Sequence, residues 1–475
     1  MFPVRSPWNL VVKPSALAAP LAALVLVVAS HAHAQQAGPL DPAAPPAVDD
    51  PMLAPPAPAG RELGSWEEAI SLSRARSTDL RTSLAETRRA EAQTRTALAA
   101  LLPTLNASVS YPHQFLTKDS TVLGSPGAAP RAVSTPQSDY FNGNATLSQS
   151  IVNVQSWHSL GTAKENEKVA RLSVEDTQRS IALGVATAVV GVVSSERVAE
   201  LNRIGLRTAL ERRELAARKR ALGVGTGLDL LRADQDVSAS RAAIVSGDEA
   251  LRRAREALGL AVGVPDQVGV ARSIQVDGVA AEAERTCTRV GGIEARADIE
   301  AARQRLLVAD RNVGNVERAF LPSVSAQSTL ASTTADLGGA QPRTTWNITA
   351  VLSIPIWDGG ARYGALRNAR ALRDESGFAL EAQRRAVTVQ IEQARRSVAV
   401  AEAALDVARQ ARQLAAEVDR LTQTAYRAGQ GTSLELVIAA SSLRQTEVGL
   451  ALREFDVVRA RLEALLALAR CSGSR

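Results

Sequence analysis

One short stretch, Ala425–Val437 (AYRAGQGTSLELV), interrupts a long run of helical periodicity. A near-echo, Lys219–Leu231 (KRALGVGTGLDLL), occurs in the first half of the chain. In each stretch a glycine, Gly223 or Gly429, can take the left-handed conformation that ends a helix. A threonine further on can cap the returning helix, and an acidic residue stands in its first turn. Each stretch therefore predicts a tight turn between two long helices.

Twelve residues of these two turns are the candidate functional residues. They are Gly223, Gly225, Thr226, Leu228 and Asp229 in the first turn, and Tyr426, Gly429, Gly431, Thr432, Ser433, Leu434 and Glu435 in the second. In the second turn the cap could be Thr432 or Ser433, because both carry a hydroxyl at the right place. A tight turn alone would also explain the glycine, threonine and acidic positions.

The helices that flank the second turn carry a heptad seam. Apolar residues follow each other at spacings of four and three, at Val387, Ile391, Ala394, Val398, Ala401, Leu405 and Ala408. The returning helix keeps this register at Val448, Leu452, Phe455, Leu462 and Leu466, interrupted by Arg459. Such seams are typical of helices that pack as coiled coils. Taken alone, the helices would also suit an ordinary bundle or stalk.

Four short segments alternate between apolar and small polar residues, which predicts strands. They are Thr104–Tyr111, Phe141–Ile151, a segment around Val324–Leu330, and Trp346–Ile354. A helix is predicted before the first of them, from an N-cap at Ser65 to about Leu102.

The chain is an internal duplication. Ala319–Ala326 (AFLPSVSA) repeats the pattern of Ala100–Ala107 (ALLPTLNA). Each half then carries a helix, a strand hairpin and two longer helices.

The strands predict a membrane barrel shared between chains. Alternation of apolar with small polar residues is typical of a barrel with a polar interior. More than half of the aromatic residues lie in or beside these strands, where they suit the membrane interfaces. Open sheet edges do not occur in lipid, and barrels start at about eight strands. Four strands in one chain therefore require several chains.

The N-terminus has the pattern of a secretory signal peptide. Arg5 and Lys13 precede the apolar run Leu17–Ser30, which ends at an A-x-A cleavage pattern, Ala32–Ala34. We expect residues 1–34 to be removed on export. No later apolar run approaches the ~18–20 residues of a membrane-spanning helix. Residues 35–63 form a Pro/Ala-rich leader that is not expected to build a core.

Composition argues against several functional classes. Aromatic residues make up 3% of the 475 residues, which is low for an enzyme with a large packed interior. The net charge of +6 comes from arginines spread beside acidic residues, with no basic cluster interleaved with aromatics, so no nucleic-acid binding is predicted. The four histidines show no ligand spacing, so no metal, cofactor or catalytic residue is predicted.

The sequence has two cysteines, Cys287 and Cys471. In an oxidising compartment the two can pair. Two separate thiols are the alternative, because spacing alone does not fix connectivity.

Several segments together resemble the TolC-like outer-membrane efflux protein family. They are ALLPTL and AFLPSV, LSIPIWDGGAR, RADIEAARQRLLVADRNVGNVERAFLPS, and YRAGQGTSLELV. The resemblance covers nearly all of residues 64–470. It implies an α+β fold: a homotrimer whose twelve-stranded outer-membrane barrel, four strands per chain, continues into a long α-helical periplasmic tunnel. It divides the chain into a first repeat (64–262), an equatorial linker (263–292), a second repeat (293–470) and a tail (471–475).

The resemblance also assigns the turns. They would be the periplasmic tips of two helical hairpins, where a periplasmic adaptor protein docks, and Asp229, Tyr426 and Glu435 match gate-lining positions. The sequence departs from the family at Gly431, where some members carry an arginine that ties the gate shut. It departs again at Ile438, where a second acidic ring is expected. The family's salt-bridge network is therefore not predicted here.

The predicted function is a passive exit duct in the outer membrane for small molecules such as drugs. Its partners would be two further copies of the chain, outer-membrane lipid, the adaptor, and an inner-membrane transporter of the RND or ABC type. Type I protein secretion through the same duct is one alternative. A barrel-anchored structural coiled-coil protein is an alternative of another class.

Overall fold

A computed structural model of the chain describes residues 48–113, 115, 120–122, 131–133, 140–272, 274, 276–334 and 343–471. The predicted signal peptide and the first part of the predicted leader lie outside these residues. The two halves of the chain contain helices of matching length. The three matched pairs are α2 (Thr78–Ala99, 22 residues) with α6 (Ala297–Arg318, 22), α3 (Val154–Ala221, 68) with α7 (Ala361–Arg427, 67), and α4 (Gly227–Val262, 36) with α8 (Ser433–Ala467, 35). The predicted duplication is therefore visible in the fold.

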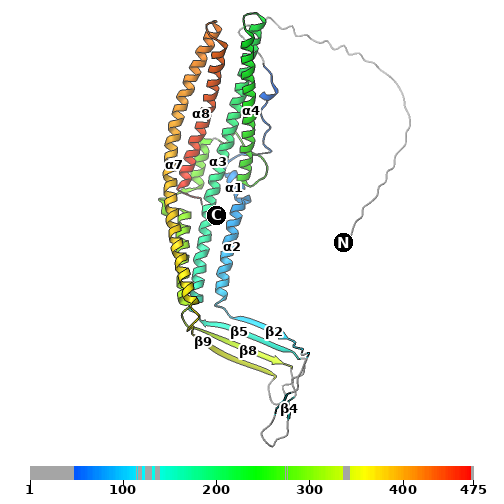
Figure 1. Ribbon diagram of the computed structural model, residues 1–475, viewed down its shortest axis with the longest axis vertical. Helices are drawn as coiled ribbons and strands as arrows, with labels where there is room; N and C mark the ends of the chain where they lie inside the picture. The colour runs from blue at the N-terminus through cyan, green and yellow to red at the C-terminus, as the bar shows by residue number, and fades with distance from the viewer. Residues whose placement is uncertain are drawn as a thin grey trace, which may run out of the picture. The chain divides into compact units, whose positions relative to one another are not determined.

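Each half forms a long helical hairpin, α3 with α4 and α7 with α8, and both turns lie at the same end (Figure 1). The predicted seam of α7 is confirmed, because Val387, Ile391 and Leu405 are buried and the other seam positions are half-buried. On α8 the prediction was wrong at Leu452, which is 43% exposed while Ala451 is buried. Since α8 packs against both α7 and α3, its buried stripe is not confined to one seam.

The predicted first helix is two helices. Ser65 caps the first, α1 (Trp66–Arg76), as expected: its side chain accepts from the Glu68 N–H. Ser77 ends α1 with a non-helical backbone, and its side chain accepts from the Leu80 N–H at the start of α2. The serine thus stops one helix and caps the next, as serine side chains do when they compete for backbone groups.

A small layer of short elements surrounds the middle of α3. It contains β1 (Arg61–Leu63) paired in parallel with β6 (Val268–Val270), α5 (Val276–Thr286), and β7 (Thr288–Arg289) paired antiparallel with β10 (Ala469–Arg470). One 3-10 turn, η2 (Ile293–Ala295), follows β7, and another, η1 (Pro51–Leu53), lies further along α3 beside Leu206. Cys287 and Cys471 form a disulfide in this layer. The residues of the predicted equatorial linker therefore pack with β1, α1 and the end of the chain.

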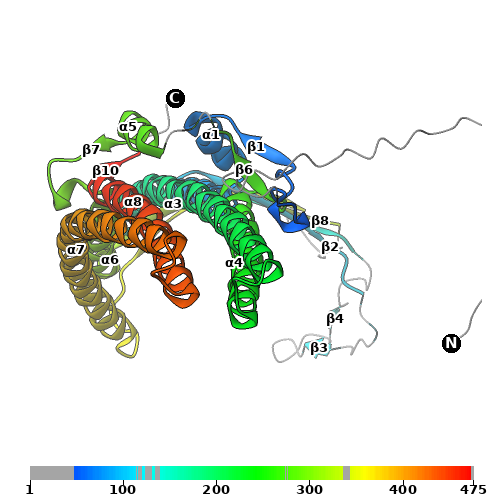
Figure 2. The same ribbon diagram turned by 90° about the horizontal axis from the view of Figure 1, so that it is seen from above.

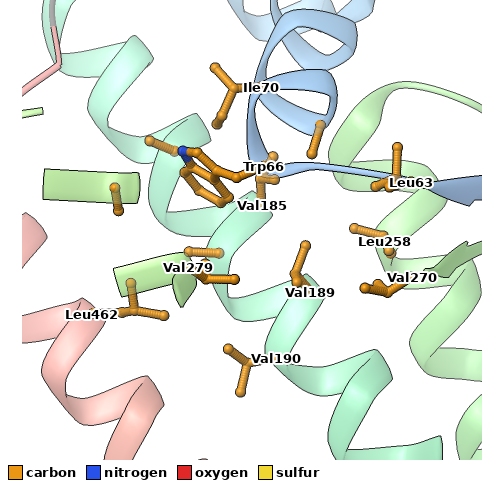
Figure 3. Close-up of a cluster of buried hydrophobic side chains, with 14 of the residues drawn as sticks. Leu63, Trp66, Ile70, Val185, Val189, Val190, Leu258, Val270, Val279 and Leu462 are labelled. Atoms are coloured by element: carbon orange, nitrogen blue, oxygen red, sulfur yellow. The ribbon is translucent and has the colours of Figure 1, made fainter. Parts of the chain in front are cut away.

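The main core lies inside this layer. Trp66 and Val279 pack with Val185, Val189 and Leu462, from α1, α5, α3 and α8 (Figure 3). The Trp66 Nε1–H donates to Thr286 Oγ1 at 3.3 Å. Helices from both repeats and the equatorial segments thus share one core.

The middle of α3 corrects the expectation that no later run would match a membrane span. Among the described residues, α3 holds an 18-residue window of mean hydropathy 1.5. Its most apolar stretch, Ile181–Val193, contributes Val185, Val189 and Val192 to the main core. The high hydropathy is accounted for by packing, because α3 is covered here from several sides.

The last part of the leader packs on the helices. From Val48 to Gly60 it lies along α3 and α4, and Met52 and Leu53 pack against a second cluster that includes Leu206 and Ile244. The leader builds no core of its own, as predicted for its composition; its apolar side chains pack on partners that α3 and α4 supply.

The four predicted strands form one antiparallel sheet at the other end of the helices (Figure 1). Its order is β2 (Thr104–Ser110), β5 (Asn142–Val152), β8 (Ser323–Thr333), β9 (Thr344–Ser353). The two repeats meet at the β5–β8 pair. A separate small ribbon pairs β3 (Ser120–Val122) with β4 (Arg131–Val133).

The register gives the sheet one face of mostly small polar residues and one of mostly apolar residues, on which β8 also places Ser328 and Ser332. Directly paired residues share a face. One cross-strand row reads Asn106, Thr146, Thr329 and Asn347, and the next row along the strands reads Ala107, Ala145, Leu330 and Trp346. In these two rows the predicted alternation runs across both repeats, while Ser328 and Ser332 interrupt it on the mostly apolar face.

Candidate functional site: the paired hairpin tips

The two turns have the same backbone geometry. Gly223 and Gly429 have φ values of 74° and 76°, in the left-handed region, as predicted. The Val224 N–H donates to the Lys219 carbonyl at 3.0 Å, and the Gln430 N–H, at the matching position, donates to the Ala425 carbonyl at 2.9 Å. These bonds satisfy carbonyls that the ends of α3 and α7 would leave free.

The second glycine of each turn lies close to the helix that it leaves. A Cβ atom on Gly225 would lie 3.0 Å from the Arg220 backbone N, and one on Gly431 would lie 3.1 Å from the Tyr426 backbone N. Any side chain at position 431 would have to displace backbone by a few tenths of an ångström. The turn itself therefore disfavours the arginine that some family members carry at this position.

Both returning helices begin with a reciprocal cap. The Thr226 hydroxyl accepts from the Asp229 N–H at 3.2 Å, and the Asp229 carboxylate accepts from the Thr226 N–H at 3.1 Å. Thr432 and Glu435 repeat this at 3.2 and 2.9 Å. Thr432, not Ser433, is therefore the cap of α8. Hydrogen bonds from the Thr432 backbone and side chain lower the pKa of Glu435 below its ordinary value.

The two tips touch each other through polar side chains. The Ser433 hydroxyl donates to the Asp229 carboxylate, and an Arg232 N–H donates to Ser433 Oγ at 3.3 Å. The Lys219 ammonium lies 3.8 Å from the centre of the Tyr426 ring. Of the three predicted gate residues, Asp229 and Tyr426 thus share one cluster, while Glu435 bonds within its own turn.

The contacts in this cluster shift the pKa values of Asp229 and Tyr426 in opposite directions. The hydrogen bond from Ser433, with help from Thr226 and the charge of Arg232, lowers the pKa of Asp229. Burial raises the pKa of Tyr426, and the negative charge of Asp229 raises it further. At neutral pH the cluster therefore holds an ionised carboxylate beside a neutral phenol.

A buried ionic cluster behind the tips was not predicted. Asp236 of α4, with a side chain 3% exposed, lies 2.8 Å from Arg212 of α3 and 3.4 Å from Arg444 of α8. The Arg444 guanidinium also donates to Ser240 Oγ at 3.0 Å. This cluster ties the first hairpin to the second. The sequence offered only a weak signal for it, an acidic residue beside the apolar position Val237.

Apolar side chains remain exposed at matching positions of both tips. Leu228 and Leu434 each follow the capping threonine by two residues and are 55% and 44% exposed. Ile438, one turn further along α8, is 56% exposed. Among the described residues, no group of three or more His, Cys, Asp or Glu side chains is placed to hold a metal ion.

A two-faced sheet joined end-on to duplicated coiled-coil hairpins defines a class of membrane protein with a barrel and a helical extension. The chain belongs to the outer membrane efflux protein family, whose sequence profile matches residues 69–264 and 293–474.

Individual relatives are distant. The toluene efflux pump outer membrane protein TtgC of Pseudomonas putida is 23% identical over 320 residues, which cover 65% of this chain and 63% of that protein. This match thus spans less than two thirds of the relative's length. Among solved structures, CusC is 18% identical with a TM-score of 0.72, covering 89% of this chain and 98% of that one. VceC of Vibrio cholerae is 20% identical with a TM-score of 0.68, covering 85% and 95%. These similarities show a common fold.

Proposed function

We propose that the protein is the outer-membrane exit duct of a tripartite export system. It passively conducts small molecules, such as drugs, from a periplasmic adaptor and an inner-membrane pump to the exterior. The observation that carries this proposal is the sheet, because a mostly polar face opposite a mostly apolar face suits a water-filled barrel in lipid. Family membership supports the outer-membrane location, reached by export with a cleaved signal peptide at residues 1–34.

A homotrimer completes the barrel in this proposal. In the part of the chain that the structure describes, the outer edges of β2 and β9 pair with no strand. Three copies would supply twelve strands, enough to close a barrel without an edge. An exposed heptad stripe on α7 supports contact between copies: Val400, Val407, Leu414 and Leu421 are 53–70% exposed at spacings of seven.

The paired tips are the proposed gate and docking site. Asp229, Tyr426 and Glu435 line the gate, and the exposed Leu228 and Leu434 offer apolar contacts to the adaptor. The contacts within one subunit, Ser433 with Asp229 and Lys219 with Tyr426, hold the two tips together. They take the place of the arginine that some family members carry at the position of Gly431.

We favour efflux of small molecules over protein secretion, because the relative TtgC is named as the outer membrane protein of a toluene efflux pump. An RND-type or an ABC-type transporter would serve as the energy source. Type I secretion remains the second candidate, since the same duct architecture would serve an unfolded polypeptide.

Single-channel conductance of the purified mature protein in planar bilayers tests the duct. The comparison is wild type with the double variant Asp229→Ala/Glu435→Ala. A matched control, Glu249→Ala/Glu463→Ala, removes the same charge from the same two helices away from the tips. We expect small, cation-selective currents in wild type and control, and larger ones in the tip variant. Correctly inserted oligomers that conduct in none of the three would refute the duct and favour the structural coiled-coil alternative.

A further inference from the structure

The segment Val48–Gly60, here called the strap, lies along the first hairpin beside α4 (the dark blue segment in Figure 1, seen from above in Figure 2). We propose that the strap is an intramolecular peptide ligand, bound to side chains of both α3 and α4, and that it braces this hairpin but not its twin. Among the described elements, no extended segment follows α7–α8 in the same way.

Three arginines hold the strap. The Arg241 guanidinium donates to the Asp50 carboxylate at 2.7 Å, and the Asp50 side chain is 6% exposed. Arg203 donates to the Ala54 carbonyl at 3.0 Å. Arg255 donates to the Ala57 carbonyl at 2.8 Å. These side chains thus recognise one carboxylate and two backbone carbonyls of an extended peptide.

Two of these arginines also cross from one helix to the other. Arg203 of α3 donates two bonds of 2.8 Å to Asp248 of α4. Arg255 of α4 donates to Glu196 of α3 at 3.0 Å. The strap carbonyls therefore satisfy N–H groups of side chains that already join the helices, and Arg255 is only 7% exposed. Removal of the strap would take the Ala57 carbonyl from Arg255 and expose that face of the guanidinium to water, so the arginine would lose a buried hydrogen bond.

The apolar side chains of the strap complete the fit. Met52 and Leu53 pack against a buried cluster on both helices, formed by Leu206, Ala209, Val237 and Ile244. The strap also contains Pro51, Pro55, Pro56 and Pro58. Proline has no N–H to satisfy and a fixed φ, so an extended proline-rich segment loses little entropy on binding. The composition that excluded a core is thus suited to a surface ligand.

The strap runs from the layer of short elements around the middle of α3 toward the tip. It continues into β1, which pairs with β6, and its contacts on α4 move from Arg255 to Arg241. At 1.5 Å per residue this interval is about 21 Å of helix. The part of α3–α4 between this layer and Val237 is therefore held by contacts that α7–α8 lacks among the described residues, which makes the repeated hairpins unequal in stiffness. The meaning of that difference for gating rests on the proposed function; the brace itself does not.

Hydrogen exchange in the full-length purified protein tests the brace. The Leu53 and Ala54 N–H groups donate within the strap, at 2.9 and 3.3 Å, and report directly on its docking. The variant Arg241→Gln removes the charge that holds Asp50. The matched control Arg252→Gln changes an exposed arginine of the same helix that makes none of the strap contacts described above.

We expect Arg241→Gln to speed exchange of the strap amides and of the facing part of α3 and α4 by about tenfold, since it removes a charge-assisted hydrogen bond. Exchange in α7–α8 should match wild type, and the control should change nothing. The variant should still fold, because the Arg241 side chain is 49% exposed.

Two results would overturn the brace. One is exchange of the strap amides at unprotected rates in wild type. The other is an Arg241→Gln variant whose strap and first hairpin exchange as slowly as in wild type, or whose α7–α8 amides speed up as much as those of the strap. A protein that shows the expected exchange pattern but conducts no ions would count against the duct alone, so the two proposals fail separately.

Discussion

Asp236→Ala should weaken the contact between the two hairpins more than the substitution of any exposed residue. The change removes the only carboxylate described between the Arg212 and Arg444 guanidinium groups. Loss of one partner from a buried ion pair typically costs about 3–5 kcal/mol, because the remaining charge stays buried. The two arginine side chains are each 18% exposed and can turn partly to water, so we take the lower end, about 3 kcal/mol.

Native-state hydrogen exchange measures this cost locally. Since about 1.4 kcal/mol is a factor of ten, amides of α4 and α8 near the cluster should exchange about 100-fold faster in Asp236→Ala. The control is Glu249→Ala, which breaks an exposed pair with Arg253 on the same helix and should change exchange by about twofold at most. An increase in Asp236→Ala no larger than in the control would refute the assignment of Asp236 as the tie between the hairpins.

Three further predictions concern other parts of the chain. Gly429→Ala places a side chain at a φ of 76° and should lower the free energy of unfolding by about 1 kcal/mol. Gly449→Ala should raise it, because Gly449 lies inside the helix α8 with open space around its Cβ position; thermal unfolding of both variants measures the two effects. Replacing Cys287 and Cys471 by alanine removes a cross-link over 184 residues and should cost about 5 kcal/mol in the chain-entropy estimate; an unchanged thermal midpoint would contradict it. Burial opposes ionisation of Asp298, but its arginine partner outweighs this and lowers the pKa below the ordinary 3.8, so its contribution is present at neutral pH and is lost as pH falls through that lowered pKa. The stability difference between wild type and Asp298→Asn should therefore shrink below pH 3.8; a difference as large at pH 2 as at pH 7 would be contrary to this assignment.

Much of the fold was predictable because its signals are local. The glycine and threonine of each turn, the seam of α7 and the alternation of the strands all depend on neighbours within a few residues. Ser77 shows the limit of this reasoning. Its position inside a helical pattern hid a stop and a new start, although the Thr78–Asp79 pair that follows is typical of a helix N-terminus.

The candidate site was predictable one tip at a time. Nothing local placed Ser433 against Asp229, which lies 204 residues earlier in the chain, or Arg444 beside Asp236, at a separation of 208. These contacts arise when the duplicated hairpins pack together, so they depend on the whole arrangement. The strap was missed for a related reason: its partners are helix side chains far along the sequence, and its own composition indicated only a lack of core.

The helices α3 and α7 have nearly equal lengths, 68 and 67 residues, and this limits which insertions and deletions the protein tolerates. One inserted residue in a long helix would rotate every later side chain by about 100° and move the turn by about 1.5 Å. The capped turn would lose its neighbour, and the buried stripe would face water. Insertions and deletions are therefore expected to accumulate in the connections between strands and in the equatorial segments. The long helices are expected to change by substitution and to keep their length.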